Sequence, residues 1–340
     1  MKKIIYFFIL FTFSTVFSQT ITGVVLDINN EPLLGATVYF DGTSFGTTTN
    51  IDGKFALRLN TKISAPLVIS FIGFNKIYLN DVDYNKRYKF ILVESTETLN
   101  EVKVFNNKFS RSQMMAVFKK QFLGTTKGGK KATIENEEEI YFSYDNDNFI
   151  LKAYADKPLI INNPYLGYKL HYDLMSFEAK FFKYSIANSV VFSSIYVGTS
   201  RFEDVENNKK TIKNRENTFE GSFLQFFRNF ANMNWGKDKF LLFNKGFQDN
   251  PNTHFTTKDT LNITQVFIKP QDRGLRKKDF IAEFSLLYNN REQSKIIFHT
   301  DNFIIDKFGL FSNYDKIYFS GALSEKKIGD LLPSDYGIEE

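Results

Sequence analysis

Short runs in which apolar and polar residues alternate dominate the first hundred positions, and this alternation restricts the chain there to half-buried β-strands. Asn29, Asn30 and Pro32 form a turn between the first two runs, and residues 50–53 form another. The pattern predicts strands over residues 21–25, 36–40, 46–49, 55–59 and 67–74. The last of these is an apolar run, as in a central strand buried on both faces. Two inner faces within about 75 residues predict a small antiparallel sandwich.

The ordered glycines and prolines of this segment resemble those of the carboxypeptidase-like regulatory domain. The residues that carry the resemblance are Gly23, Pro32, Leu33, Gly35, Ala36, Gly42, Thr43, Gly46, Thr47, Asp52, Gly53, Phe55 and Gly73. That family has a transthyretin-like, seven-stranded β-sandwich fold and no chemistry of its own. The resemblance therefore implies that residues 20–93 form a sandwich that binds or spaces rather than catalyses.

A second resemblance concerns the residues after the sandwich. The family often forms an N-terminal extension of TonB-dependent receptors, and Leu-Asn-Glu-Val-Lys-Val at residues 99–104 is similar to the segment that follows it in SusC-like receptors. In those receptors a plug and a 22-stranded barrel come next. Only about 235 residues follow here, too few for both. We therefore expect the receptor extension to be joined to a different domain, through a linker at residues 94–104.

The N-terminus predicts export. Lys2 and Lys3 precede an apolar run over residues 4–13, and small and polar residues follow to position 19. This is the pattern of a signal peptide over residues 1–19, which we expect to be cleaved between Ser18 and Gln19. No later apolar run is long enough for a transmembrane helix after signal removal. The pattern predicts a location in the periplasm or at the outer membrane.

Composition excludes several classes of protein. The chain has no cysteine, which excludes disulfides and a lipid-bearing cysteine, while 39 Phe and 17 Tyr favour strands. The formal net charge of +5 includes Lys2 and Lys3, so the processed chain would carry about +3. That excess is too small to predict binding to nucleic acid. The length of 340 residues predicts two domains after processing.

Residues 105–335 predict a second domain. Helices are expected over residues 110–123 and 209–233, the second with a core stripe formed by Phe219, Phe223, Phe226, Phe227 and Phe230. Alternating strands are expected at 140–144, 150–154, 168–172, 261–268, 280–288, 296–299 and 314–319. The basic run 127–131 and the acidic run 135–139 suggest a solvated connection. The whole chain is therefore expected to be mostly β: a seven-stranded sandwich plus a β-rich α+β domain with one or two helices.

This second half resembles an uncharacterised domain that follows the same sandwich in exported proteins of Gram-negative outer-membrane systems. The resemblance rests on residues 157–159, 163–168, 219–222, 226–228 and 332–336. It implies no activity. The candidates for a partner contact are Tyr165, Tyr168, Tyr172, Arg215 and Arg228.

Three patterns suggest catalysis or metal binding, and each fails in its context. Residues 42–46 match Gly-x-Ser-x-Gly, but they lie between two strand-like runs and predict a hairpin loop instead of a nucleophile elbow. The only histidines, His171, His254 and His299, form no zinc motif. Residues 145–148 lack the later ligands of a calcium loop and predict a hairpin turn. We therefore predict no catalytic residue, no metal, no cofactor and no enzymatic activity.

The sequence favours a non-catalytic accessory or interaction protein of the cell envelope, binding a protein or a glycan. Two alternatives remain open: a small outer-membrane β-barrel preceded by a periplasmic sandwich, and an undetected hydrolase. The polar, acidic residues 331–340 and the Phe-rich helix argue against the barrel. Against the hydrolase stands the lack of a recognisable catalytic motif.

Overall fold

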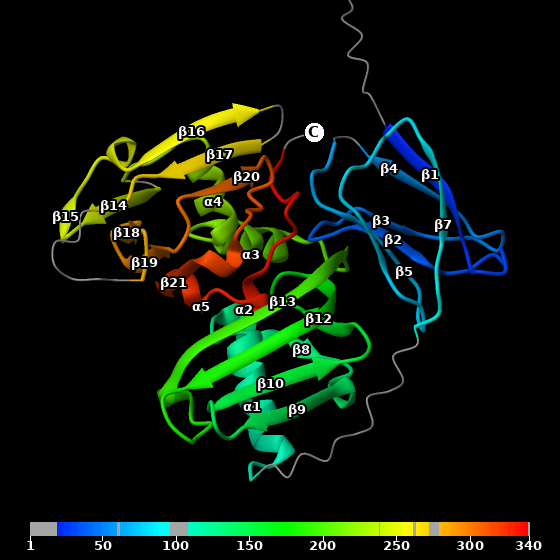
Figure 1. Cartoon of the computed structure of the whole chain (residues 1–340), viewed down its shortest axis with the longest axis horizontal. Coiled ribbons are helices and arrows are strands. Elements are labelled where there is room, and N and C mark those ends of the chain that lie inside the picture. The colour runs from blue at the N-terminus through cyan, green and yellow to red at the C-terminus, as the bar shows by residue number, and fades with distance from the viewer. Residues whose placement is uncertain are drawn as a thin grey trace, which may run out of the picture.

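The computed structural model describes residues 19–59, 62–95, 108–237, 239–260, 263–271 and 279–338. They form three bodies that meet around the C-terminal segment: a sandwich, a six-stranded sheet with helices, and a third body with two sheets (Figure 1). The predicted signal peptide up to residue 18 and the predicted linker from residue 96 lie outside the described residues. In the part of the chain that the structure describes, no helix is both long and apolar enough to cross a membrane.

The first body is the expected seven-stranded sandwich. One sheet contains β4 (Lys54–Leu59), β1 (Gln19–Leu26) and β7 (Arg87–Ile91); the other contains β3 (Gly46–Thr48), β2 (Thr37–Phe40), β5 (Leu67–Ser70) and β6 (Ile77–Leu79). β1 is antiparallel to β4 and parallel to β7. The residue pattern had indicated only five of these strands; the two that it missed are short, β6 with three residues and β7 with five.

Two glycines explain why the sandwich closes tightly. A Cβ on Gly23 would lie 2.6 Å from the Tyr88 carbonyl oxygen and 2.7 Å from the Phe55 ring. Gly53 has a φ of +69°, and a Cβ there would lie 2.5 Å from the Val25 carbonyl oxygen. Only glycine fits both the turn and the close approach of the strands.

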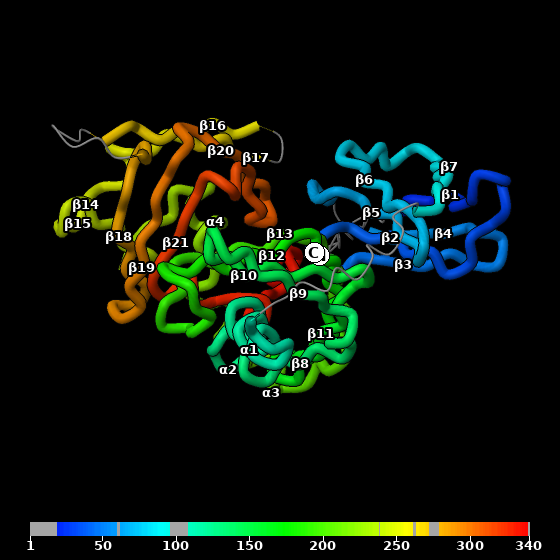
Figure 2. The backbone as a smooth tube through the Cα atoms, turned by 60° about the horizontal axis from the view of Figure 1, so that its bottom comes forward, coloured from blue at the N-terminus to red at the C-terminus, as the bar shows by residue number. Residues whose placement is uncertain are grey.

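The second body is a six-stranded sheet covered on one face by α1 (Arg111–Phe122). Its strands are β8 (Thr133–Ile134), β9 (Ile140–Asp145), β10 (Ile150–Ala155), β11 (Leu159–Asn163), β12 (Tyr168–Phe181) and β13 (Val191–Asp204). The long β12 pairs with β10, β11 and β13. The ring of Phe118 lies 4.8 Å from that of Phe177, so α1 packs directly on β12 (Figure 2).

The hairpin turn predicted at residues 145–148 is confirmed. Oδ1 of Asp145 accepts hydrogen bonds from the amides of Asp147 and Asn148, both at 3.0 Å, and the turn joins β9 to β10. Phe149 closes it with a φ of +56°. The aspartate therefore caps its own turn.

The third body contains two sheets. One has the order β15 (Phe247–Gln248), β14 (Phe240–Asn244), β18 (Ala282–Tyr288), β19 (Glu292–Phe298) and β21 (Ile317–Gly321); the other has β16 (Phe255–Thr260), β17 (Ile263–Ile268) and β20 (Asn302–Asp306). Both sheets pack against Phe226, Phe227 and Phe230 of α4 (Phe223–Ala231). The predicted domain over residues 105–335 thus contains two separate hydrophobic cores.

The single helix expected over residues 209–233 is two helices, α3 (Lys209–Phe219) and α4. Gly221 has a φ of +67°, and the Ser222 hydroxyl accepts from the Gln225 amide at 3.1 Å, so one helix ends and the next is capped. The phenylalanine stripe is divided accordingly. Phe219 packs against Tyr336 beside the second body, whereas the buried phenylalanines of α4 belong to the third.

The described residues of the second half contain more helix than the one or two helices expected, although the mostly β class is confirmed. Besides α1, α3 and α4 there are the short α2 (Lys127–Lys131) and α5 (Ala322–Glu325). α2 replaces the solvated connection expected at 127–131. Gly128 and Gly129 are buried against η5 (Ile328–Asp330), where a Cβ on Gly128 would lie 2.1 Å from the Gly329 carbonyl oxygen. These glycines allow two backbones to touch.

Candidate functional site

The loop between β2 and β3 pairs with the outer edge of β13. The Gly42 amide donates to the Ser200 carbonyl oxygen at 2.7 Å. The Phe202 amide donates to the Thr43 carbonyl oxygen at 3.1 Å. The Ser200 amide donates to Oδ1 of Asp41 at 2.7 Å. The loop therefore satisfies backbone groups that an edge strand leaves unpaired, and we call this contact the sandwich interface.

An ion pair lies inside the sandwich interface. Nζ of Lys76, from the sandwich, is 2.5 Å from Oδ1 of Asp173 on β12. The Tyr39 hydroxyl donates to Oδ2 of the same carboxylate at 3.1 Å, and the Thr199 hydroxyl donates to it at 3.4 Å. Asp173 is only 8% exposed, so these donors replace the water that a buried carboxylate loses.

Burial changes the acidity of two groups at the sandwich interface. Desolvation raises the pKa of Asp41 to about 6, although the amides of Ser200 and Gly42 favour its carboxylate form. Desolvation, followed by the charge of Asp173, raises the pKa of Tyr39 above its ordinary value. Contact between the bodies therefore favours the protonated form of Asp41 and keeps Tyr39 a donor.

The C-terminal segment contacts the same loop. The Ser334 amide donates to the Gly42 carbonyl oxygen at 2.7 Å. The Ser44 hydroxyl and amide donate to the two carboxylate oxygens of Asp335, at 2.5 and 3.0 Å. Phe308, which follows β20 and is fully buried, packs in the hydrophobic core of the sandwich. The second body, the third body and the C-terminal segment therefore hold the sandwich in place.

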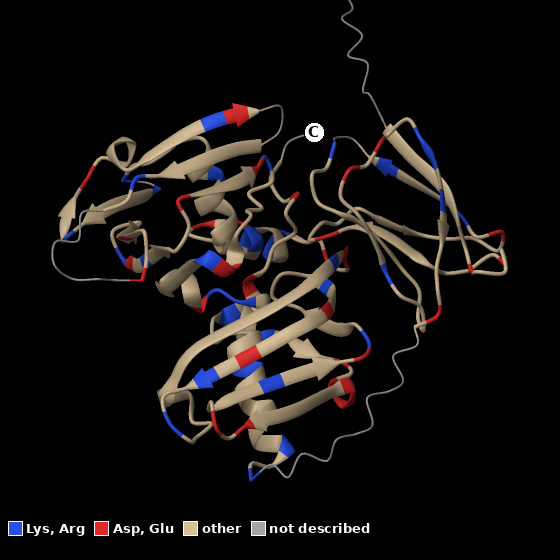
Figure 3. Cartoon of the chain, in the orientation of Figure 1, with Lys and Arg blue, Asp and Glu red and all other residues tan. Residues whose placement is uncertain are grey.

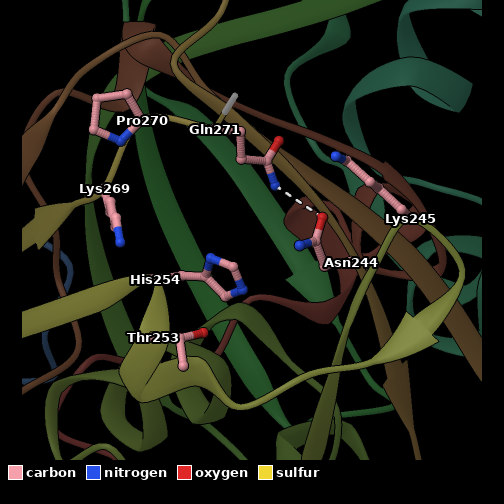
Figure 4. A pocket seen from close by; sticks show the side chains of 7 residues that line it. All are labelled: Asn244, Lys245, Thr253, His254, Lys269, Pro270 and Gln271. Atoms are coloured by element: carbon pink, nitrogen blue, oxygen red, sulfur yellow. Dashed lines mark hydrogen bonds between the residues drawn. The ribbon is translucent and has the colours of Figure 1, made fainter. Parts of the chain in front are cut away.

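A cavity of about 230 Å³ lies in the third body, beside the ends of β16 and β17. Figure 4 shows its lining: Asn244, Lys245, Thr253, His254, Lys269, Pro270 and Gln271. The Lys269 amide donates to the His254 carbonyl oxygen at 2.8 Å, which continues the β16–β17 ladder by one rung. In Figure 4 the Lys269 side chain is directed toward His254, and Lys245 extends from the opposite side.

A chain of hydrogen bonds holds several of the side chains that line this cavity in place. Nε2 of Gln271 donates to Oδ1 of Asn244 at 3.3 Å, drawn as a dashed line in Figure 4. Nδ2 of Asn244 donates to Oδ2 of Asp249 at 3.2 Å, and Nε2 of His254 lies 2.8 Å from the same oxygen. The bonds from His254 and then Asn244 lower the pKa of Asp249. Asp249 therefore stays ionised at neutral pH and orients the imidazole.

A second hollow of about 490 Å³ shares the turn η3 (Pro251–Thr253) with this cavity: Pro251 and Asn252 line the hollow, and Thr253 lines the cavity. Its apolar lining includes Met233, Trp235 and Phe240, and its polar lining includes Gln248, Asn250 and Asn252. The Trp235 ring is nearly parallel to the ring of Phe255, at 10° and a centroid separation of 6.2 Å. Packing therefore fixes the indole beside the hollow.

Comparison with known proteins identifies the sandwich. Residues 21–104 match the family of the CarboxypepD_reg-like domain. The chain therefore contains a CarboxypepD_reg-like domain at its sandwich. Over 90 residues the chain is 39% identical to the TonB-dependent receptor SusC of Bacteroides thetaiotaomicron, and this match covers 26% of the chain and 8% of the receptor. The chain thus shares only a small part of the receptor's length.

A comparison with solved structures aligns part of the chain with a lipoxygenase. The crystal structure of a 9R-lipoxygenase from Cyanothece PCC8801 aligns with 65% of this chain and 49% of its own, at 10% identity and a TM-score of 0.18. A score this low carries no argument about the fold of the residues that follow the CarboxypepD_reg-like domain.

The structure does not present Tyr165, Tyr168, Tyr172 and Arg215 as one exposed surface. Tyr168 and Tyr172 are each 5% exposed, and Tyr165 packs against the same core. Arg215 is 4% exposed. Its guanidinium donates to both carboxylate oxygens of Asp204, at 2.8 and 3.0 Å, and stacks on the Tyr168 ring. These residues stabilise the second body, because a buried guanidinium requires such partners.

Arg228, the fifth predicted contact residue, holds the C-terminal segment. It donates to the carbonyl oxygens of Phe308, Ser334 and Tyr336, at 3.1, 2.7 and 2.8 Å. Burial lowers the pKa of its guanidinium to about 10, which leaves it charged at neutral pH. Arg228 thereby positions two segments that hold the CarboxypepD_reg-like domain.

The residues of the apparent catalytic motifs lie apart from one another. Ser44 is in the loop between β2 and β3, as the hairpin interpretation requires, and its hydroxyl is bound to Asp335. His171 on β12 pairs with Glu203, His254 contacts Asp249, and His299 packs against Tyr318. Within the described ranges no three His, Cys, Asp or Glu side chains are grouped to hold a metal ion.

Sequence reasoning missed both the sandwich interface and the lining of the two hollows. The partners at the interface are far apart in the chain, for example Ser44 and Asp335, and no local pattern joins them. Around the hollows a local signal existed: residues 244–254 contain Asn, Asp, Thr and Pro in a density that is typical of an ordered turn.

Proposed function

We propose that the protein is a non-catalytic interaction protein of the Gram-negative cell envelope that binds a protein or a glycan in the periplasm or at the outer membrane. The observation that carries the proposal is the fixed contact between the CarboxypepD_reg-like domain, β13 and the C-terminal segment. A sandwich held in this way acts as an accessory that sets the position of the other bodies. The similarity to the receptor SusC supports an envelope location.

We also propose the domain boundaries given by the sequence: a sandwich at 20–93, a linker at 94–104 and a second unit at 105–335. The described part of this linker is Glu94, which forms a β-bridge with Phe74, and Ser95, whose amide donates to the Gly73 carbonyl oxygen at 2.8 Å. The first two residues of the linker therefore lie against the sandwich.

Export provides the first test. Expressed with its leader in a Gram-negative host, the chain is expected in the periplasmic or outer-membrane fraction, with Gln19 as its first residue. Cell fractionation and N-terminal sequencing measure this. A variant that lacks residues 1–18 serves as the control and should stay in the cytoplasm. Recovery of the full-length chain, still beginning at Met1, from the cytoplasm would contradict an envelope function.

The second test concerns catalysis. The processed protein is expected to hydrolyse neither generic peptide nor generic ester substrates, because the Ser44 hydroxyl donates to Asp335 and the matched family is a regulatory-like domain. Wild type, Ser44→Ala and a chelator-treated sample are compared in the same assay. A wild-type rate that is lost in either of the other two samples would establish a hydrolase and end the non-catalytic proposal.

A further inference from the structure

We propose that the two hollows beside η3 form one binding site for an acidic oligosaccharide, whose sugar ring rests by Trp235 and whose carboxylate reaches Lys245 and Lys269. The inference deepens the proposed function, since it assigns the glycan a chemical class and a place. It starts from the continuity of the lining. Asp249, Asn250 and Asn252 line the larger hollow, and the following Thr253 and His254 line the smaller cavity. A ligand that crosses this turn contacts both.

The smaller cavity has the character of an anion site. Acidic and basic residues are interspersed along the three bodies (Figure 3), and many form pairs such as Lys152 with Glu178 at 3.3 Å. Among the described residues, Lys245 and Lys269 belong to no such salt bridge. Both are exposed and line the cavity with His254. The carboxylate of Asp249 beside the cavity is already engaged by His254 and Asn244. An incoming carboxylate therefore meets two uncommitted ammonium groups.

The larger hollow has the character of a sugar site. Its volume of about 490 Å³ lies within the range of roughly 300–1,000 Å³ for small-molecule sites, whereas the cavity of about 230 Å³ is below it. A pyranose ring has apolar C–H faces that pack on an aromatic ring such as Trp235, and hydroxyls that bond to amides such as Asn250 and Asn252. An acidic peptide lacks a ring of this kind, which is why the lining favours an oligosaccharide.

The backbone at Lys245 gives independent support. Lys245 and Gly246 form the two-residue loop between β14 and β15, with φ values of +51° and +89°. Such a loop favours Asn-Gly, and a lysine in the left-handed region is strained by its Cβ. A strained residue at the mouth of a cavity points to a function for its side chain. Asparagine would fit this loop better but would lack the ammonium group, so the ammonium group is the functional part of Lys245.

The test uses the purified processed protein and an oligogalacturonate. Trp235 is the only tryptophan of the chain, so its emission reports directly on the larger hollow. We expect a saturable change of emission that weakens with added salt. Lys245→Asn and Lys269→Met should each weaken binding about tenfold, the loss of one charge-assisted contact. Lys245→Asn should at the same time keep or raise the melting temperature, because it relieves the loop.

The controls separate the sources of the signal. Lys209→Met, at an exposed lysine of α3, should bind as wild type does. The methyl-esterified oligogalacturonate has the same rings without the charge and should bind at least tenfold more weakly. The proposal is overturned if the ester binds equally well, or if polyglutamate binds equally well or more tightly. It is also overturned if neither lysine variant changes the affinity, or if calorimetry detects no binding of the oligogalacturonate. Export and hydrolysis are measured separately, so such a failure leaves the proposed envelope function standing.

Discussion

Replacement of Phe230 by alanine is expected to lower the free energy of unfolding of the third body by about 3–5 kcal/mol, as complete truncation of a buried phenylalanine does. Phe230 is 1% exposed. Its ring lies within 4.7 to 5.7 Å of the rings of Phe226, Trp235, Phe255 and Phe303. The two sheets of this body meet at α4, so the cavity left behind has walls from both and cannot collapse easily.

Denaturant unfolding followed by Trp235 emission measures this effect, since the indole lies 5.1 Å from the Phe230 ring. Phe223→Ala, on the same helix, is the matched control. Phe223 is only half-buried and packs against Phe319, so its truncation should cost about 1–2 kcal/mol. Equal effects of the two variants would show that α4 does not form the centre of this core.

The fold of the sandwich could be predicted because its signals are local. Alternation places Phe55, Leu57 and Leu59 on one face of β4, where they are indeed buried, and turn residues mark the ends of the runs. β7 carries the same signal, because Tyr88 and Phe90 are buried and alternate with exposed residues, but its run of five residues was not recognised as a strand. Its parallel pairing with β1, more than sixty residues away, has no local signal. Only the family resemblance implied seven strands.

The break between α3 and α4 was visible in the sequence and was outweighed by the phenylalanine spacing. Gly221 followed by Ser222 is a helix stop beside a helix start, and the structure uses both. The helical spacing of the phenylalanines nevertheless continues across this break, because Phe219 and Phe223 each face a hydrophobic core. These are different cores, and periodicity alone cannot distinguish them.

The contact residues proposed from the sequence show that the chemistry of a side chain does not predict whether it is exposed. Arg215 and Tyr168 carry groups that partners often bind, but they bind each other and Asp204 inside the second body. Whether such a side chain is exposed depends on residues that lie far away in the sequence. The same holds for Lys245 and Lys269, which β14 and β17 bring to one cavity although no motif relates them.

Replacement of Lys76 by methionine is expected to weaken the sandwich interface by about 2 kcal/mol. The change leaves the Asp173 carboxylate buried with only the hydroxyls of Tyr39 and Thr199 as donors, and an unpaired buried charge is costly. Hydrogen exchange of the Ser200 and Phe202 amides measures the contact, since their acceptors belong to the sandwich. Both amides should exchange faster in Lys76→Met, whereas amides within α4 should not change.

Lys54→Met is the matched control, because Lys54 pairs with Asp52 at 3.2 Å where both side chains are more than half exposed. Such a pair contributes little, so its loss should leave the Ser200 amide protected as in wild type. Unchanged exchange in Lys76→Met would show that the ion pair with Asp173 does not hold the sandwich. Faster exchange in both variants would point to a general loosening of the sandwich instead.

Besides the ion pair of Lys76 with Asp173, protonation of Asp41 is expected to affect the sandwich interface, and the pH dependence of exchange at the Ser200 amide measures it. The pKa of Asp41 is raised from 3.8 to about 6 in the folded chain, chiefly by burial and, to a smaller extent, by the charge of Asp173. The stabilisation that follows is fully present below pH 3.8 and is lost as the pH rises through about 6. After correction for intrinsic exchange, the Ser200 amide should therefore be better protected at pH 5 than at pH 7. Asp41→Asn keeps an acceptor for this amide but cannot titrate, so its protection should not vary with pH. A wild-type protein with the same protection at both pH values would exclude proton uptake by Asp41.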